Sequence, residues 1–165
     1  MTTKEFIKDL DFSYFKTYSL LRLEETRDYT NDLYIKLGKI SDEVERSEIL
    51  NLTIRGTKKL LLETGIPHPT AKEISIFTKN SLEYQLLQQI LNTEFVQQYD
   101  WMCMPVFREM IVFYDDNHNI ISLLNICLSC DRIEDEYQNN IKTDYMVFDK
   151  LRTFFVNIGH IVEGS

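Results

Sequence analysis

The sequence predicts an α+β fold, a mostly antiparallel sheet with two main helices packed on one face. Three observations lead to this prediction: short segments rich in β-branched and aromatic residues, a polar turn that joins two of them, and two stretches with the apolar spacing of a helix. Because the order is helix, strands, helix, hairpin, helix, an antiparallel sheet covered by helices buries these apolar faces best.

The length of the chain favours one domain. A chain of 165 residues, 44% of them hydrophobic, is long enough for one core and too short for two ordinary domains. The sequence contains no repeat and no linker-like tract, and its glycines and prolines stand singly apart from a loop over 65–69. We therefore expect a single α+β domain over 1–165.

The first part of the chain predicts a short helix followed by strands. Residues 2–9 form the helix, and residues 12–23, rich in Phe, Tyr and Leu, form a strand. A short strand over 34–38 comes next. Residues 46–54 and 57–63 then alternate as the two arms of a hairpin.

The middle of the chain predicts a strand and a long helix. The strand covers 74–77, and Asn80 can cap the helix because Glu83, three residues on, can reach back to the cap. Apolar residues at helical spacing predict the face that lies on the sheet. They are Leu82, Leu86 and Ile90, flanked by Leu87, Leu91 and Phe95.

The last third predicts a hairpin and a final helix. Residues 110–114 and 120–128 are strands, and the Asp, Asn and His residues of 115–119 favour the turn between them. A polar loop over 131–142 follows. The final helix is capped by Asp144 and ended by Gly159, and its buried face consists of Val147, Leu151, Phe154 and Ile158.

The excess of acidic residues restricts the kinds of partner that the protein can bind. Asp and Glu number 26 against 18 Lys and Arg, and this net charge of −8 repels phosphate backbones, so we expect no nucleic acid partner. The first residues lack the apolar run of a signal peptide, and no stretch reaches about 18 uncharged residues. With only three cysteines, these features predict a cytoplasmic protein that does not bind membranes.

The sequence carries no recognisable catalytic motif. It has no glycine-rich phosphate loop, no His-Glu-x-x-His and no Gly-x-Ser-x-Gly. His68, His118 and His160 are expected to be solvated loop residues, and Asp115 and Asp116 to serve the turn instead of acid–base chemistry. We expect no catalytic residues, although an enzyme site that no local motif reveals stays open.

Three cysteines, Cys103, Cys127 and Cys130, are predicted to lie at one end of the hairpin. With the turn near Asn117, Cys103 lies close to Cys130, and a Cα separation above about 10 Å, well outside disulfide range, would contradict this placement. Three interpretations stay open: packed apolar thiols, a zinc site and a redox pair. The acidic residues after Cys130 disfavour the redox pair, because they raise the pKa of a thiol. We expect no cofactor unless the cysteines bind zinc.

Residues around the hairpin also form a pattern seen elsewhere. Cys103, Pro105 and Arg108 are followed by Ile-Val-Phe-Tyr-Asp at 111–115 and Ile-Cys-Leu-Ser-Cys at 126–130. This pattern resembles that of small, largely uncharacterised bacterial proteins with a cysteine, a Pro/Arg element and an Ile-Cys-x-x-Cys. The resemblance implies a hairpin and carries no activity with it.

Two functional hypotheses follow. The first is a small acidic protein-binding module, in concrete form a bacterial immunity protein that neutralises a basic antibacterial toxin, because opposite charges speed association. The alternative is a zinc- or thiol-dependent sensor or enzyme centred on Cys103, Cys127 and Cys130. Neither fixes an oligomeric state. The first hypothesis places the partner-binding surface in the acidic segment, at Asp131, Glu134, Asp135 and Glu136.

Overall fold

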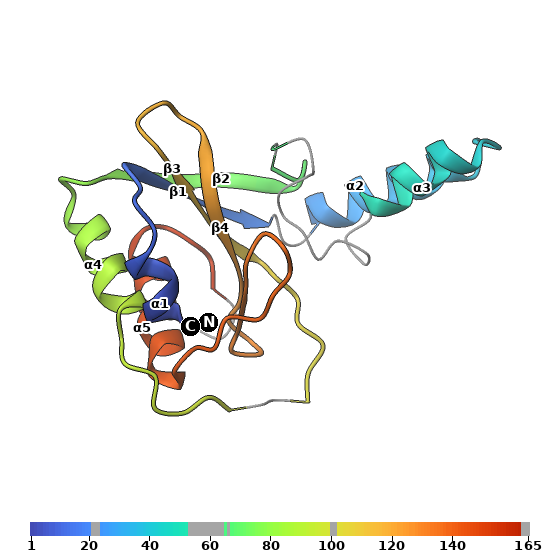
Figure 1. Ribbon diagram of the computed structural model, residues 1–165. Helices are drawn as coiled ribbons and strands as arrows, with labels where there is room; N and C mark the ends of the chain where they lie inside the picture. Colours follow the sequence, from blue (N-terminus) through green and yellow to red (C-terminus); the bar gives the residue numbers. More distant parts are fainter. Residues whose placement is uncertain (21–23, 53–64, 66, 100–101, 163–165) are drawn as a thin grey trace. The chain divides into compact units, whose positions relative to one another are not determined.

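The protein has an α+β fold built on a five-stranded sheet of order β2-β1-β3-β4-β5 (Figure 1). The computed structural model describes residues 1–20, 24–52, 65, 67–99 and 102–162. The strands are β1 (Tyr14–Leu20), β2 (Ala71–Thr78), β3 (Glu109–Tyr114), β4 (Ile120–Cys127) and β5 (Arg132–Glu134). The helices are α1 (Thr3–Lys8), α2 (Glu24–Leu37), α3 (Glu43–Asn51), α4 (Leu82–Leu91) and α5 (Tyr145–Asn157).

The chain divides into two compact units. One unit comprises Met1–Ser19 with Glu73–Ser165 and contains most of the sheet with α1, α4 and α5. The other is Leu20–Lys72, which contains α2 and α3. The single domain over 1–165 stays a prediction.

The β3–β4 hairpin has the predicted position and turn. The two strands are antiparallel, with Glu109 facing Ile126. In the turn, the Asp115 carboxylate accepts hydrogen bonds from the backbone N–H groups of Asn117 and Asn119, each at 2.8 Å. The hydrogen bonds from the Asn119 side chain and backbone are the main reason that the pKa of Asp115 lies below its ordinary value. Turn chemistry therefore fixes this aspartate, as the sequence predicts.

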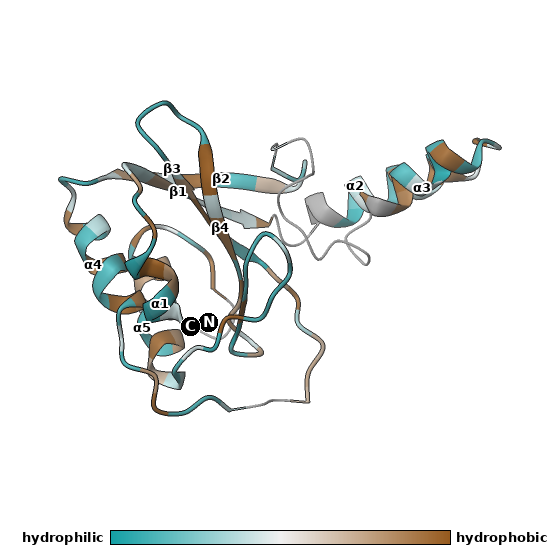
Figure 2. Ribbon diagram, in the orientation of Figure 1, coloured by the Kyte–Doolittle hydropathy of each residue, from teal (hydrophilic) through white to brown (hydrophobic). Residues whose placement is uncertain are grey.

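Aromatic rings form the centre of the core on the helix-covered face of the sheet. The Phe12 ring lies 4.8 Å from that of Phe113 on β3 and 4.6 Å from that of Tyr84 on α4, measured between centroids. The Tyr84 hydroxyl donates to the Phe12 carbonyl at 2.9 Å, so the buried phenol is satisfied. Figure 2 shows apolar stretches along the strands and on the helices that supply this core.

The helix α4 forms where predicted, but its cap and buried face differ. Ser81, one residue after the predicted Asn80, is the N-cap and accepts from the Tyr84 N–H at 3.1 Å. Leu82 and Leu86 are exposed, because the face on the sheet also includes a tyrosine, which a count of aliphatic residues overlooks. The residues that α4 buries are Tyr84, Leu87, Ile90 and Leu91.

The helix α5 confirms its predicted ends and face. Asp144 caps it by accepting from the Met146 N–H at 3.0 Å. Gly159, at φ +97°, ends it in the left-handed conformation. The Gly159 N–H donates to Val156 O and the His160 N–H to Phe155 O, the paired bonds of a Schellman motif. Val147, Leu151 and Phe154 are buried, with Ile158 packed at the margin of the core.

The strand predictions for the unit that contains α2 and α3 are wrong. Residues 34–38 fall mainly in α2, and most of 46–54 belongs to α3. The α3 helix begins at Asp42, whose carboxylate accepts from the Glu45 N–H at 2.9 Å. Residues 41–48 are all exposed, so this helix has no apolar stripe and its periodicity gave no helix signal.

One further prediction falls on residues that the structure does not describe, and another is refined by the structure. The predicted hairpin arm 57–63 and the end of the first predicted strand, 21–23, lie outside the described residues. The predicted polar loop over 131–142 contains the short strand β5, which pairs with β4. The buried Ile133 in β5 gives that short strand its place in the core.

Leu151 tests the contribution of α5 to stability. Because its side chain is completely buried, Leu151→Ala should lower the free energy of unfolding by about 2–5 kcal/mol. Val156→Ala is the control on the same helix, since Val156 is 43% exposed and lies outside the core, and its truncation should change stability by about 0.5 kcal/mol or less. Urea unfolding followed by circular dichroism measures both; equal effects would show that α5 does not pack on this core.

Candidate functional site: the corner around the Cys103–Cys130 disulfide

Cys103 and Cys130 meet at the open end of the hairpin, as predicted. Their Cα atoms are 6.0 Å apart, and their sulfur atoms form a disulfide. Cys130 lies in the turn between β4 and β5, and Cys103 lies in the connecting segment that leads from α4 to β3 (residues 93–99 and 102–108). The antiparallel pairing of β3 with β4 leads both chain segments to this corner, and the β4–β5 turn brings Cys130 to Cys103.

Cys127 is the free thiol of the three and is buried. Its Sγ accepts a hydrogen bond from the Val106 N–H at 3.3 Å and lies 3.4 Å from the Ser129 hydroxyl. Zinc would require Cys103 and Cys130 as separate thiolates, whereas here their sulfurs are bonded to each other. In the part of the chain that the structure describes, no three His, Cys, Asp or Glu side chains are grouped to hold a metal. The zinc hypothesis stays a prediction.

The four carboxylates of the predicted acidic segment all make contacts within the protein. Asp131, in the left-handed conformation at φ +49°, pairs with Arg152 of α5 at 2.6 Å. Glu134 is buried and pairs with Arg132 at 2.9 Å. Glu136 accepts from the Ser122 hydroxyl at 3.0 Å. The segment is therefore built into the sheet edge and is not the freely solvated loop that we expected.

Asp135, the fourth carboxylate, repeats the role of Asp115. It accepts from the Tyr137 and Asn139 N–H groups at 2.9 and 2.8 Å, and the Asn139 side-chain amide donates to its other oxygen at 2.9 Å. Gln138 has φ +65°, the value found at His118 in the hairpin turn. An Asp-x-x-x-Asn turn thus occurs twice, twenty positions apart. Asp135 is required by its turn and is buried.

The connecting segment runs from α4 to β3, with no helix or strand in its described residues (Figure 1), and contacts hold it at two points. At the start, the Asp144 carboxylate accepts from the Val96 and Gln97 N–H groups at 2.9 and 3.0 Å. Desolvation opposes the charged form of this carboxylate, but these hydrogen bonds and that from Met146 hold the pKa of Asp144 below its ordinary value. Further along the segment, the disulfide ties Cys103 to the β4–β5 turn.

Around these anchors the connecting segment exposes apolar side chains. Val96 is 75% exposed, Met104 is 86% exposed and Met102 is fully exposed. An anchored backbone that presents apolar side chains to solvent is typical of a protein-interaction surface, where methionine and aromatic residues are enriched. We call this set the apolar surface; it consists of Phe95, Val96, Tyr99, Met102, Met104 and Val106, with Tyr145 and Met146 from α5.

A small cavity lies beside the disulfide. Its volume is about 40 Å³, room for a few water molecules or the end of a small ligand. Its lining joins the connecting segment to the turn and the acidic segment: Gln98, Tyr99, Cys103, Cys130, Asp131, Arg132 and Asn140. The structure thus brings two of the cysteines and one of the predicted carboxylates to one place.

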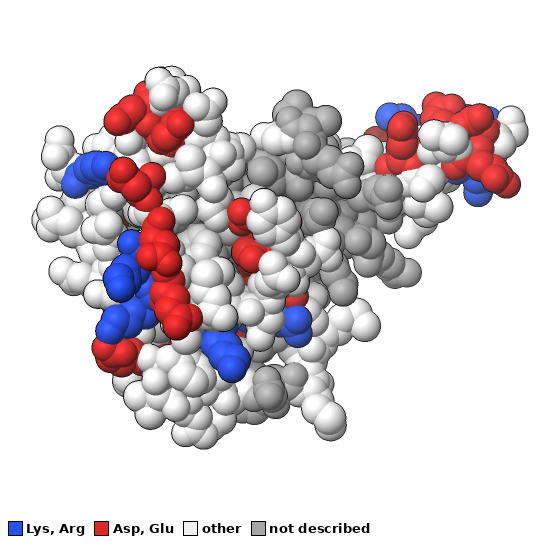
Figure 3. All heavy atoms as spheres, viewed as in Figure 1, with Lys and Arg blue, Asp and Glu red and all other residues white. Residues whose placement is uncertain are grey.

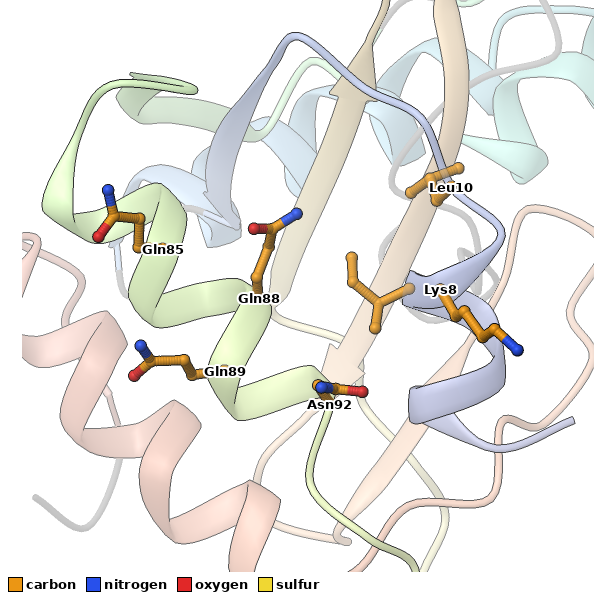
Figure 4. Close-up of a pocket in the computed structure, with 7 residues that line it drawn as sticks. Lys8, Leu10, Gln85, Gln88, Gln89 and Asn92 are labelled. Atoms are coloured by element: carbon orange, nitrogen blue, oxygen red, sulfur yellow. The ribbon is translucent and has the colours of Figure 1, made fainter.

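A larger hollow of about 570 Å³ lies between α1 and α4 (Figure 4). Gln88 and Asn92 lie on the side of α4 that faces α1, and Gln85 and Gln89 lie along the same helix. Primary amides neither titrate nor act as nucleophiles, so this lining supplies no acid–base or covalent chemistry apart from the Lys8 ammonium.

The expectation that all three histidines are solvated is wrong for two of them. His160 is buried, contacting the Glu109 carboxylate through Nδ1 and the Thr17 hydroxyl through Nε2 at 2.8 Å. His68 is buried as well, and desolvation lowers its pKa. Only His118 is exposed, in the hairpin turn.

The Thr17–His160–Glu109 series has the order of hydroxyl, imidazole and carboxylate found in hydrolases that use a hydroxyl nucleophile. Thr17 is completely buried, however, and a hydroxyl that substrate cannot reach does not act as a nucleophile. We therefore interpret this series as a structural link between α5, β1 and β3.

The fold and this corner define an α+β protein with a disulfide-anchored apolar surface. Comparisons with protein-family models, with curated proteins and with solved structures find no match to this chain. The resemblance to small bacterial proteins with an Ile-Cys-x-x-Cys stays a prediction, and the function is argued from the residues themselves.

His160 tests the buried polar link. His160→Phe keeps a ring against Phe155 but removes a partner from the Glu109 carboxylate, which is 1% exposed, so it should cost about 3 kcal/mol or more of stability. Replacing Glu109 by Met in the same chain should recover part of that loss. His118→Asn, at an exposed site that favours the left-handed conformation, should change stability by about 0.5 kcal/mol or less. In thermal unfolding, His160→Phe should be the least stable variant, the double variant with Glu109→Met should be intermediate, and His118→Asn should match wild type. Any other order would contradict the structural link.

Asp144 tests the anchor of the connecting segment. Asp144→Ala removes the α5 cap and both bonds to the segment, and should cost about 1–2 kcal/mol at neutral pH. Because the folded-state pKa of Asp144 is lowered, its contribution is present above the unfolded value near 3.8 and is lost as pH falls through the lower folded value. The difference between wild type and variant in urea unfolding should therefore shrink in acid, whereas Asp149→Ala, an exposed change on the same helix, should have little effect at any pH.

Proposed function

We propose that this protein is a protein-binding module for a basic protein, and that it contacts this partner through the apolar surface. The concrete form of the proposal is a bacterial cytoplasmic immunity protein that neutralises a basic toxin. The observation that carries it is the exposure of Val96, Met102 and Met104 on a backbone held at Val96 and at Cys103. A fixed segment loses little conformational entropy on binding, so its apolar contacts contribute more of their energy to affinity.

The charge of the chain supports a basic partner. The net charge is −8, and α3 carries exposed carboxylates at Asp42, Glu43, Glu45 and Glu48. Arg46, the cation of this helix, donates to the carbonyls of Leu37 and Ile40 at 2.7 and 3.0 Å. Figure 3 shows acidic side chains gathered over α2 and α3 and at the tip of the β3–β4 hairpin. Such a field speeds association with a positive partner and repels nucleic acid.

The acidic segment has a smaller part in this proposal than the sequence suggested. Glu134 and Asp135 are buried, so a partner can reach only Asp131 and Glu136 there. Reversing the charge of the buried pair would damage the fold before it tested binding. The apolar surface, not these carboxylates, is therefore the place to mutate.

No helix in the described part of the chain is long and apolar enough to cross a membrane. We propose the cytoplasm as the location on the composition of the sequence. Disulfides in that compartment are usually transient and redox-sensing.

A photo-crosslinking residue at Met104 tests the proposal in cells that produce the protein. It should capture one basic protein, whereas the same residue at Val156, an exposed position on α5, should not. With the captured protein purified, Met102→Ser together with Met104→Ser should weaken binding by about tenfold or more, which corresponds to about 1.4 kcal/mol. Val156→Ser should leave the affinity unchanged.

Bacterial growth tests the proposed immunity function. The captured protein, produced alone, should arrest bacterial growth, and wild-type protein produced with it should restore growth while the double methionine variant does not. The wild-type association rate should fall steeply with added salt. An acidic partner, or equal affinities of wild type and double variant, would overturn the proposal; a basic partner without toxicity would overturn its immunity form.

A further inference from the structure

We propose that the Cys103–Cys130 disulfide is a thiol-exchange site for small-molecule thiols of the glutathione class, and that exchange releases the part of the apolar surface around Met102 and Met104. The second part rests on the proposed function, because it describes the regulation of the same surface. The observations that carry the inference are the unequal exposure of the two cysteines, the ion pairs that neutralise the carboxylates beside the buried one, and the position of the bond between the two exposed methionines of the connecting segment.

The two cysteines differ in access. Cys103 is exposed, whereas Cys130 is buried in the β4–β5 turn. An incoming thiolate from solvent therefore reaches Cys103 Sγ first. The cavity of about 40 Å³ beside the bond gives the attacking group room next to the sulfurs.

The charges around Cys130 do not oppose it as the leaving group. On the sequence alone the neighbouring carboxylates disfavour a thiolate. In the folded protein they are paired: Asp131 pairs with Arg152, and Glu134 pairs with Arg132, which lines the same cavity. Because they are paired, these carboxylates disfavour a Cys130 thiolate less in the folded protein than the sequence alone indicates.

The exchange is balanced in two steps. A thiolate RS⁻ attacks Cys103 Sγ, the Cys103–Cys130 bond breaks, a Cys103–S–S–R bond forms, and Cys130 leaves as a thiolate. A second RS⁻ attacks the R-bearing sulfur, which gives RSSR and frees Cys103 as a thiolate. The protein disulfide gains two electrons, and two thiols are oxidised to RSSR. Oxidised thiol drives the same steps backwards.

Exchange removes the anchor next to the methionines. Cys103 stands between Met102 and Met104 in the chain, so the disulfide holds the backbone that carries both of them. The Asp144 anchor acts at Val96 and Gln97, at the other end of the segment. Without the disulfide, the two methionines must be ordered when the partner binds, and that ordering lowers the affinity.

The first test uses the purified protein without a partner. Incubated with reduced glutathione, wild type should form a mixed disulfide that peptide mass spectrometry places at Cys103. Cys127→Ser, which keeps an acceptor for the Val106 N–H, should give the same adduct. An adduct at Cys127 or Cys130 in place of Cys103, or no adduct while the disulfide is being reduced, would overturn the exchange site.

The second test measures release of the segment. Limited proteolysis within 102–108 should be about tenfold or more faster in reduced wild type than in oxidised wild type. The variant with both Cys103→Ser and Cys130→Ser should match the reduced protein whatever the glutathione ratio. Equal cleavage of oxidised and reduced wild type would overturn release.

The third test separates this inference from the proposed function. The affinity for the captured partner should be about tenfold lower for reduced than for oxidised wild type. If exchange and release occur but both forms bind equally, the regulation is wrong and the proposed function stands. If the methionine substitutions leave binding unchanged, the proposed function is wrong, and the exchange site is judged by the first two tests alone.

Discussion

In the β3–β4 hairpin Glu109 faces Ile126, and a slip of this register by one residue would turn every side chain of a strand to the opposite face. Several features depend on this pairing. It directs the apolar side chains of both strands into the core, brings Cys103 to Cys130 beyond the strand ends, and holds Glu109 where His160 reaches it after α5. The core, the disulfide and the buried polar link therefore depend on one pairing, which is set by the turn closed by Asp115 together with the register shift between Phe113 and Tyr114.

The elements that the sequence predicted correctly are those with strong local signals. The hairpin turn at 115–119 and the capped, glycine-ended α5 carry such signals within a few residues of each other. The α3 helix was missed because it buries almost nothing and its Val and Ile residues suggest strands. Its only signal was a cap: Asp42 with Glu45 three residues on.

At the candidate site, contacts between residues far apart in the sequence were the hardest features to predict. The approach of Cys103 and Cys130 follows from register and was predictable. The pairing of Asp131 with Arg152, a residue 21 positions away on another element, was not. The burial of His160 had a signal that went unused: the residue after a helix-ending glycine commonly packs back on the last turn, as His160 does on Phe155.

The disulfide also changes how the chain is connected. Cys103 and Cys130, 27 positions apart, close a covalent ring that contains all of β3 and β4 and the turn between them. A single backbone cut in the exposed turn at 116–119 therefore leaves the two fragments joined and the strand pairing in place. New chain ends can be introduced at this tip, by nicking or by circular permutation, without separating either strand from the sheet.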